Sequence, residues 1–239
     1  MFSKEETKRV IEGLWNYLDT GTNVDAGCQV KNPVSSYTCG EMARQEWESF
    51  FQDYSHALGL SSELPEAGSF LTNSDLGKPI LMSRDEQDKY RAFLNVCRHR
   101  GAILEEKERG RRRLFSCPFH GWGYSSAGGL ISVPKEDQFG DIDKSCNGLV
   151  ELPAEEKHGI LWVHPDPNGS FDLEAQLGDL AAEFESWDFE KYIFQGNTTF
   201  EHQMNWKLAI DTFGETYHFN TLHRDTLAKD FHGNCQMYD

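Results

Sequence analysis

Two short Cys–His pairs place the strongest constraint on how this chain can fold. One residue separates Cys97 from His99, two separate Cys117 from His120, and 17 residues lie between the pairs. Thiolates and imidazoles together are ligands that zinc and iron–sulfur centres prefer. A fold that uses all four must bring two loops face to face. The pattern therefore predicts a metal centre held between two loops.

The ligand types alone leave two kinds of centre open. A tetrahedral zinc ion accepts two cysteines and two histidines, but zinc fingers usually take both cysteines from one loop and both histidines from the other. Here each loop supplies one of each. A two-iron, two-sulfide cluster, with two thiolates on one iron and two imidazoles on the other, suits this mixed arrangement. The arrangement favours the cluster, with structural zinc as the alternative.

The two segments resemble the cluster loops of Rieske proteins. In each, a glycine after the Cys–His pair lets the backbone turn tightly. The Rieske proteins of respiratory chains have one further cysteine in each loop, and here those positions hold Ala102 and Phe119. The match is therefore with the Rieske domains of bacterial oxygenases and soluble ferredoxins. The segments are Cys97-Arg98-His99-Arg100-Gly101 and Cys117-Pro118-Phe119-His120-Gly121-Trp122.

This resemblance implies a ligand set. Cys97 and Cys117 would bind one iron of a [2Fe-2S] cluster, and His99 and His120 the other. A free-standing Rieske ferredoxin would need only about half of this chain. The remaining residues are therefore expected to carry a second function.

A second motif lies near the end of the sequence. Glu215 precedes His218 by three residues, and His223 follows His218 by five. In a helix Glu215 and His218 would share a face, and a break after His218 would be needed to bring His223 to the same metal. Two imidazoles and one carboxylate on one side of an iron, with open positions for dioxygen, form the facial triad of non-haem Fe(II) oxygenases.

The second motif resembles the iron-binding segment of Rieske oxygenase large subunits. The resemblance runs from Asn205-Trp206-Lys207-Leu208 to His223, and it implies that His218 and His223 bind a mononuclear iron. Glu215 stands where the family has a carboxylate that carries electrons between subunits. The family's third iron ligand is a later carboxylate, expected beyond residue 239, and the nearer candidates by chemistry are most simply surface or turn residues. Those candidates are Asp225, Asp230 and Asp239.

One departure from the family pattern lies just before this motif. Asp211-Thr212 stands where Glu-Asn is common in the family. Any hydrogen bond that the asparagine makes near the iron must therefore be replaced or absent.

Composition narrows the function classes. The 239 residues carry 23 Lys and Arg against 39 Asp and Glu, a net charge of −16, which disfavours binding to nucleic acid or anionic membrane surfaces. No apolar stretch is long enough to span a bilayer, and the N-terminus lacks a signal peptide. We expect a cytoplasmic protein, in which the six cysteines are not a disulfide framework.

Periodicity gives the expected elements. Helices are predicted after Ser3, from Thr38 to near Gly59, along an acidic connector within 151–190, and from Asn205 through Tyr217. A strand is predicted at 195–202. Short apolar runs punctuated by turn residues indicate a small antiparallel β domain, with strands at 69–72, 79–82, 90–96, 113–116 and 159–164.

These elements and the resemblance define an α+β chain. We expect an N-terminal helical segment at 1–44, an all-β Rieske domain at 45–165, and the start of a catalytic domain of the helix-grip type at 166–239. The chain would then be an N-terminal fragment of an oxygenase large subunit.

The implied function is that of a terminal oxygenase component. Electrons from NAD(P)H would arrive through a separate reductase, and in some systems a ferredoxin, and Fe(II) would activate O₂ to hydroxylate or demethylate an aromatic or other small organic substrate. The resemblance also implies a trimer, or a hexamer with small subunits. The alternatives are a Rieske electron carrier, an inactive fragment and a structural zinc protein.

One feature goes beyond the motifs. Five basic residues lie within seven positions of the segment that joins the cluster loops: Lys107, Arg109, Arg111, Arg112 and Arg113. We expect this tip, together with Arg98 and Arg100, either to be a solvated hairpin or to steer an acidic electron donor.

Overall fold

The computed structural model describes residues 4–23, 25, 27–232 and 235. The chain divides into two compact units, one formed by residues 44–197 and the other by the described parts of 1–43 and 198–239. No helix in the described part of the chain is both long and apolar enough to cross a membrane.

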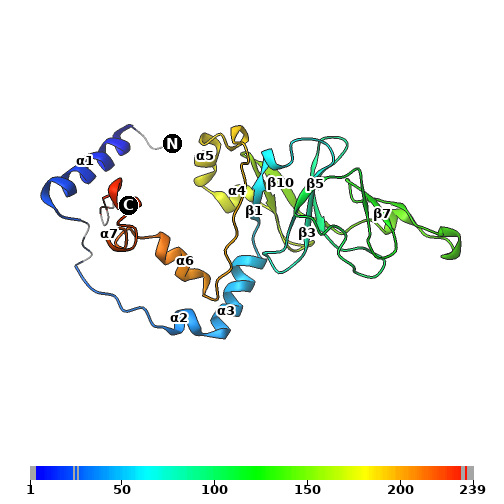
Figure 1. Ribbon diagram of the computed structural model, residues 1–239, viewed down its shortest axis with the longest axis horizontal. Coiled ribbons are helices and arrows are strands. Elements are labelled where there is room, and N and C mark those ends of the chain that lie inside the picture. The colour runs from blue at the N-terminus through cyan, green and yellow to red at the C-terminus, as the bar shows by residue number, and fades with distance from the viewer. Residues whose placement is uncertain (1–3, 24, 26, 233–234, 236–239) are drawn as a thin grey trace. The chain divides into compact units, whose positions relative to one another are not determined.

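Within residues 44–197, all of which are described, the chain forms three antiparallel sheets (Figure 1). The first has the order β1-β11-β10, the second β5-β2-β3-β4-β9 and the third β6-β7-β8. The bounds are β1 His56–Leu60, β2 Ser69–Asn73, β3 Ile80–Arg84, β4 Tyr90–Leu94, β5 Arg109–Arg111, β6 Leu114–Ser116, β7 Gly123–Ser125, β8 Leu130–Ser132, β9 Glu151–Leu152, β10 Ala154–Lys157 and β11 Ile160–Val163.

The prediction of a small antiparallel β domain is confirmed. Each predicted apolar run contains a strand, namely β2, β3, β4, β6 and β11. Strands β5, β7, β8, β9 and β10 were missed because they are short, and β5 and β10 are mostly polar, with sequences RGR and AEEK. Pairing with an apolar neighbour, rather than their own composition, makes these segments strands.

The predicted helix from Thr38 to near Gly59 is wrong in its second half. The chain forms α2 (Ser35–Thr38), α3 (Gly40–Glu46) and a π-helical stretch, η1 (Trp47–Gln52). From His56 the backbone instead pairs with β11, His56 lying opposite Val163. Tertiary pairing thus ends the helix before His56, whereas the aromatic residues of Trp47–Gln52 stay helical.

The acidic connector is helical only in its second half. Its first residues form β9 and β10, and the helix divides into α4 (Leu173–Leu177) and α5 (Leu180–Ser186). The Asp172 side chain caps α4 by accepting from the Ala175 N–H at 3.0 Å, and Gly178, with φ of 51°, ends it. Leu173 and Leu177 pack on the buried face of β11.

The second unit contains helices near both ends of the chain. They are α1 (Lys4–Thr20), α6 (Trp206–Phe213) and α7 (Phe219–Leu222). The predicted cap Ser3 lies outside the described residues, whereas Asn205 caps α6 as expected, its side chain accepting from the Lys207 N–H at 3.0 Å. The strand predicted at 195–202 is wrong, because no neighbouring strand pairs with this segment.

The remaining short turns are 3-10 helices. Their bounds are η2 Ser61–Glu63, η3 Glu136–Gln138, η4 Lys144–Cys146, η5 Phe189–Lys191 and η6 Leu227–Lys229.

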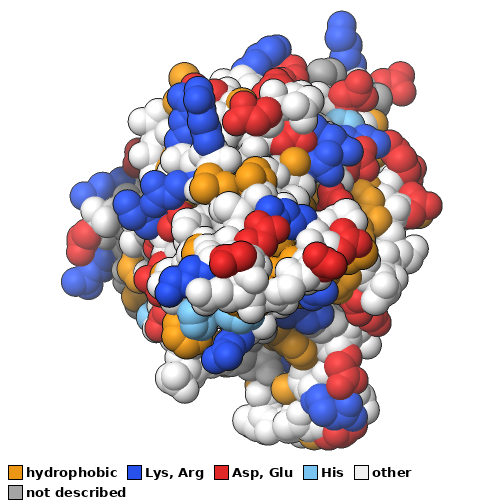
Figure 2. Space-filling model, turned by 90° about the vertical axis from the view of Figure 1, so that its right-hand side faces the viewer, with side chains coloured by type: hydrophobic (Ala, Val, Ile, Leu, Met, Phe, Trp, Pro, Cys, Tyr) orange, Lys and Arg blue, Asp and Glu red, His pale blue; other side chains and the backbone are white. Residues whose placement is uncertain are grey.

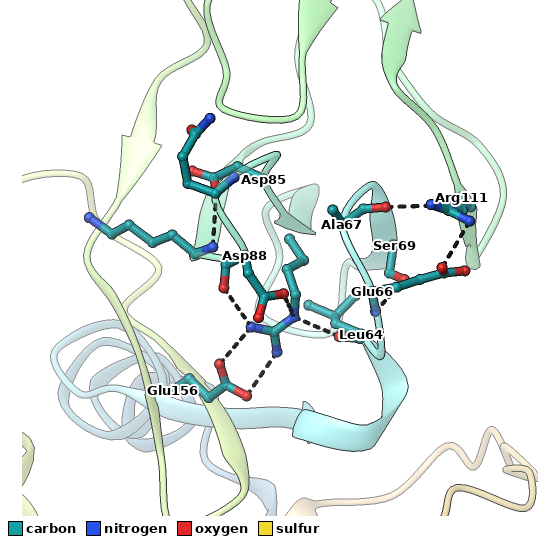
Figure 3. A network of polar contacts seen from close by, with 11 residues as sticks. Leu64, Glu66, Ala67, Ser69, Asp85, Asp88, Arg111 and Glu156 are labelled. Carbon is teal, nitrogen blue, oxygen red and sulfur yellow. Dashed lines mark hydrogen bonds and ion pairs between the residues drawn. The ribbon is translucent and has the colours of Figure 1, made fainter.

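A buried arginine ties the first sheet to the second (Figure 3). Arg84, at the end of β3, makes two hydrogen bonds with the Glu156 carboxylate on β10, at 2.9 and 2.8 Å. Its Nε donates to the Leu64 carbonyl at 2.6 Å. Only 9% of the Arg84 side chain is exposed, so these acceptors replace its water.

Replacing Arg84 by Met should therefore lower the free energy of unfolding by about 2–3 kcal/mol, because Glu156 and the Leu64 carbonyl would lose their donor. Urea unfolding followed by tryptophan fluorescence measures this. The matched control is Arg111→Met, which removes an exposed ion pair with Glu66 and should cost less than about 1 kcal/mol. Equal losses in the two variants would contradict this assignment.

Stability should also fall in mild acid because of His56. Burial holds the pKa of His56 below its ordinary value of 6.5, and His164 acts in the same direction. The unfolded chain then binds more protons than the folded one, so the free energy of unfolding decreases as the pH drops below about 6.5. Urea midpoints between pH 7.5 and 5.5 should show a shallower loss in His56→Gln, and parallel curves would refute it.

Candidate cluster and iron sites

The two predicted cluster loops share one backbone frame. In the first, the Cys97 N–H donates to the Ala102 carbonyl at 2.8 Å and the Gly101 N–H returns to the Cys97 carbonyl at 3.0 Å. In the second, Cys117, Trp122 and Gly121 make the same two bonds at 2.8 and 2.9 Å. Both loops are therefore six-residue turns closed in the same way, although histidine stands at the third position in one and the fourth in the other.

Glycine is required in both turns. Gly101 has φ of 76° and Gly121 has φ of 72°, values that side chains with a Cβ rarely adopt. A Cβ on Gly121 would also lie 3.1 Å from Pro134. The expectation that these glycines allow tight turns is confirmed.

Each loop is held at its base. The Asn95 side chain exchanges two hydrogen bonds with the Glu105 backbone, at 2.7 and 3.0 Å, and closes the first loop. The second loop joins β6 to β7, where Ser116 pairs with Gly123. Sequence reasoning missed the role of Asn95, because neither its burial nor its contact with Glu105 can be read from the sequence.

The two thiols lie inside the hydrophobic core. Cys97 is 2% exposed and Cys117 4%, among the side chains of Phe70, Phe93 and Phe115. Burial, together with the neighbouring Cys97 thiol, raises the pKa of Cys117. Two thiols forced together without a cation are unfavourable as thiolates, so the site fits a group that brings positive charge.

The two imidazoles lie at the surface end of the same site. The ring centroids of His99 and His120 are 4.8 Å apart, and His120 is exposed. His99 stacks on Trp122 at 4.9 Å and 7°, and Phe139 meets its edge at 5.8 Å. Burial, with the nearby His120 and Arg100, lowers the pKa of His99, which favours the neutral form that binds metals. Figure 2 shows histidine side chains beside hydrophobic and basic ones on this face of the molecule.

The donor set fits two irons better than one ion. In the described part of the chain, no group of three or more His, Cys, Asp and Glu side chains is arranged to hold a single metal ion. A [2Fe-2S] cluster asks for two protein ligands on each iron, which matches a buried thiol pair beside an exposed imidazole pair. A single tetrahedral zinc would instead need all four ligands at one point.

A buried tyrosine contacts the thiol side of this site. The Tyr124 hydroxyl lies 3.4 Å from Cys97 Sγ, and the Arg98 N–H donates to its oxygen at 3.0 Å. Because the oxygen already accepts a hydrogen bond, the hydroxyl hydrogen is available to the sulfur. Sequence reasoning missed Tyr124, which no spacing rule connects to the loops.

The basic tip is mostly paired. Arg109 binds Glu63, Arg111 binds Glu66 and Arg112 binds Glu105, each at 2.9 to 3.0 Å. Arg109 also lies over the Phe194 ring at 4.0 Å. These contacts compensate much of the predicted positive charge and favour the solvated hairpin. In contrast, neither Arg98 nor Arg100 has an acidic partner within the described chain.

The three candidate side chains of the second motif, those of Glu215, His218 and His223, lie outside regular helix. Helix α6 ends at Phe213, four residues earlier than predicted, where the Gly214 N–H closes its last turn on the Ile210 carbonyl. Glu215 then reaches forward over a turn. Its Oε2 accepts from the His218 N–H at 3.2 Å and its Oε1 contacts His218 Nδ1 at 2.5 Å. The prediction of a helix that breaks after His218 is therefore wrong, since the break comes before Glu215.

The two histidines of the motif are brought together by α7. His218 precedes this one-turn helix and His223 follows it, with ring centroids 5.3 Å apart. The His218 hydrogen bond lowers the pKa of Glu215, so this carboxylate stays ionised. Tyr217, His218 and Asp225 line an open hollow of about 1310 Å³ together with Tyr17 and Asn23 from the end of α1.

No third iron ligand joins this pair among the described residues. Asp225 contacts Arg224 and is exposed, Asp230 is exposed, and Asp239 lies outside the described residues. Asp211 accepts a hydrogen bond from the Tyr37 hydroxyl at 2.6 Å. The carboxylate that departs from the family pattern therefore binds the segment before α3.

Two family models match successive parts of the chain. Residues 55–153 match the Rieske [2Fe-2S] domain, and residues 189–239 match the catalytic domain of the ring hydroxylating alpha subunit. The chain belongs to the family of Rieske ring-hydroxylating oxygenase alpha subunits. The match to a catalytic domain weighs against a Rieske electron carrier alone.

Individual relatives carry two kinds of oxygenase name. The chain is 31% identical to the anthranilate 1,2-dioxygenase large subunit of Acinetobacter baylyi over 80% of its own length and 42% of the relative's. It is 33% identical to the glycine betaine monooxygenase oxygenase subunit of Chromohalobacter salexigens over 82% and 43%. The chain thus spans less than half the length of these family members.

A solved structure gives the same relationship. The quaternary ammonium Rieske monooxygenase CntA, in complex with L-carnitine, matches 83% of this chain and 56% of that one, with a TM-score of 0.74 and 26% identity. The α+β class, with an all-β Rieske domain, is confirmed.

Removing the Tyr124 hydroxyl should lower the midpoint potential of a bound cluster. A hydrogen bond to Cys97 Sγ stabilises the more negative, reduced state, so Tyr124→Phe loses about 1 kcal/mol of that preference, or ~40 mV for one electron. Redox titration followed by visible circular dichroism measures the shift. Tyr90→Phe, a buried tyrosine outside the site, is the control, and equal potentials in all three proteins would contradict the prediction.

Proposed function

We propose that this chain is part of the large subunit of a Rieske oxygenase. In this proposal Cys97, Cys117, His99 and His120 hold a [2Fe-2S] cluster, and His218 and His223 hold a mononuclear iron. When bound, the cluster supplies single electrons, and Fe(II) supplies open positions for dioxygen beside the substrate. The observation that carries the proposal is the presence, in one chain, of a buried thiol pair beside an imidazole pair and of a separate carboxylate–imidazole pair.

The cysteines of the cluster site are buried, whereas its histidines are closer to the surface, and the two pairs have different roles. The core around Cys97 and Cys117 excludes water from the thiolates, and their loops present backbone N–H groups around them. His99 and His120 reach the surface, so an electron donor can approach on the imidazole side. This division supports an electron path that enters and leaves through the histidines.

Glu215 orients the first iron-binding histidine. Its carboxylate accepts a hydrogen bond from His218 Nδ1–H, and in this neutral tautomer Nε2 is unprotonated and free to bind a metal. The lowered pKa of Glu215 keeps the carboxylate charged for this role. We further propose that Glu215 connects His218 to a cluster histidine of a neighbouring subunit, which would make the assembly a trimer, with or without small subunits.

Other parts of the proposal rest on the family. Electrons would come from NAD(P)H through a reductase and in some systems a ferredoxin, and the protein would work in the cytoplasm. The relatives' names point to aromatic compounds and quaternary ammonium compounds as substrate classes, with hydroxylation or demethylation as the outcome. We also propose domain limits at 1–44, 45–165 and 166–239.

Metal analysis of the full-length protein tests the two sites separately. Wild type should bind about three irons and two sulfides per subunit. His218→Ala should lose about one iron and keep the red-brown absorption, because the cluster residues are untouched. Cys97→Ser should lose the absorption.

The control is His202→Gln, a histidine outside both sites, which should keep all the iron. Retention of the third iron in His218→Ala, or a colourless wild type, would contradict the proposal. Oxygen uptake with benzoate-type and betaine-type compounds, supplied with reductase, then separates the substrate classes.

A further inference from the structure

A tryptophan beside the cluster loops has an unexplained polar atom. Trp122 closes the second loop through its carbonyl, and only 6% of the residue is exposed. Its Nε1 is buried and has no hydrogen-bond acceptor among the described residues. Leaving a buried N–H without an acceptor costs about 1–3 kcal/mol, so a stable fold normally supplies one.

The surroundings of the indole point toward the cluster site. Its ring lies parallel to that of His99 at 4.9 Å, and the Phe139 edge meets it at 6.0 Å. It belongs to the same core as Cys97 and Cys117. Its ring contacts are with His99 and Phe139, and neither accepts its hydrogen here.

A bound [2Fe-2S] cluster would bring the missing acceptor in the form of its sulfur atoms. Inorganic sulfides and cysteine thiolates carry negative charge and accept hydrogen bonds from N–H donors. We infer that the Trp122 indole N–H donates to a sulfur of the bound cluster and so acts as a positioning residue that raises its midpoint potential. This inference rests on the proposed cluster binding at these loops.

The direction of the effect follows from charge. Reduction adds one negative charge to the cluster, so an N–H donor stabilises the reduced state more than the oxidised one. The same residue also shields His99 from water by stacking, and a substitution must separate the two effects. Trp122→Phe removes the N–H but also reduces the stacked area. Replacing the Trp122 indole by benzothiophene, through incorporation of β-(3-benzothienyl)alanine at position 122, removes the N–H and keeps both rings.

A second buried tryptophan, Trp162, offers a matched control. Trp162 is buried to the same degree, 5% exposed, but its Nε1 donates to the Lys157 carbonyl at 3.2 Å. It belongs to a different hydrophobic core from the cluster loops. The same two replacements at Trp162 remove a satisfied N–H that is remote from the loops. They should cost stability and leave the potential of the cluster unchanged.

The experiment is a redox titration of the loaded protein, followed by visible circular dichroism. Both position-122 variants should titrate at lower potential than wild type, with iron and sulfide contents unchanged, and both position-162 variants should titrate with wild type. An unchanged potential in the benzothienyl variant would overturn the inference. Loss of iron and colour in wild type would instead overturn the proposed cluster binding.

A second readout is independent of the midpoint potential. Ultraviolet resonance Raman spectra report the hydrogen-bonding state of indole N–H groups, and the wild-type minus Trp122→Phe difference isolates this one. The Trp122 N–H band should be that of a free group without the cluster and of a bonded group with it. A band at the same position in both forms would also overturn the inference.

Discussion

The meeting of two buried thiols is the constraint on which the Rieske unit depends. Cys97 and Cys117 lie in the core and come from loops with 14 residues between them, so strands on both sides must hold the loops in register. Asn95 fixes the base of one loop and the β6–β7 hairpin the base of the other. The aromatic core then surrounds the thiols, and Arg84 ties this framework to the outer sheet.

The same arrangement sets where charge can lie. The thiol side is apolar and closed, whereas the imidazole side is bordered by exposed Phe119 and by Arg98 and Arg100. Most of the neighbouring arginines are occupied by glutamates, so the acidic chain does not gain a broad positive surface here. Any partner that exchanges electrons with the site meets a narrow surface of mixed apolar and basic character.

Local chemistry determined how much could be predicted from sequence. The four candidate cluster residues and the two motif histidines could be proposed from the sequence because each set is compact and chemically unusual. Strands rich in apolar residues were found as well. Segments such as β5 and β10 were missed because their structure comes from pairing, and β1 was missed for the same reason, since a helix was predicted there. Tyr124 and Asn95 act across space, which no spacing in the sequence records.

In the two loops, the backbone conformation does not depend on which position carries the histidine. Both turns close with the same pair of hydrogen bonds, yet one carries its histidine at the third position and the other at the fourth. The histidine can thus stand at either the third or the fourth position of the turn, as long as cysteine stays at the first position and glycine at the fifth. Divergence within such loops can then alter the approach of a ring to its iron without refolding the domain around it.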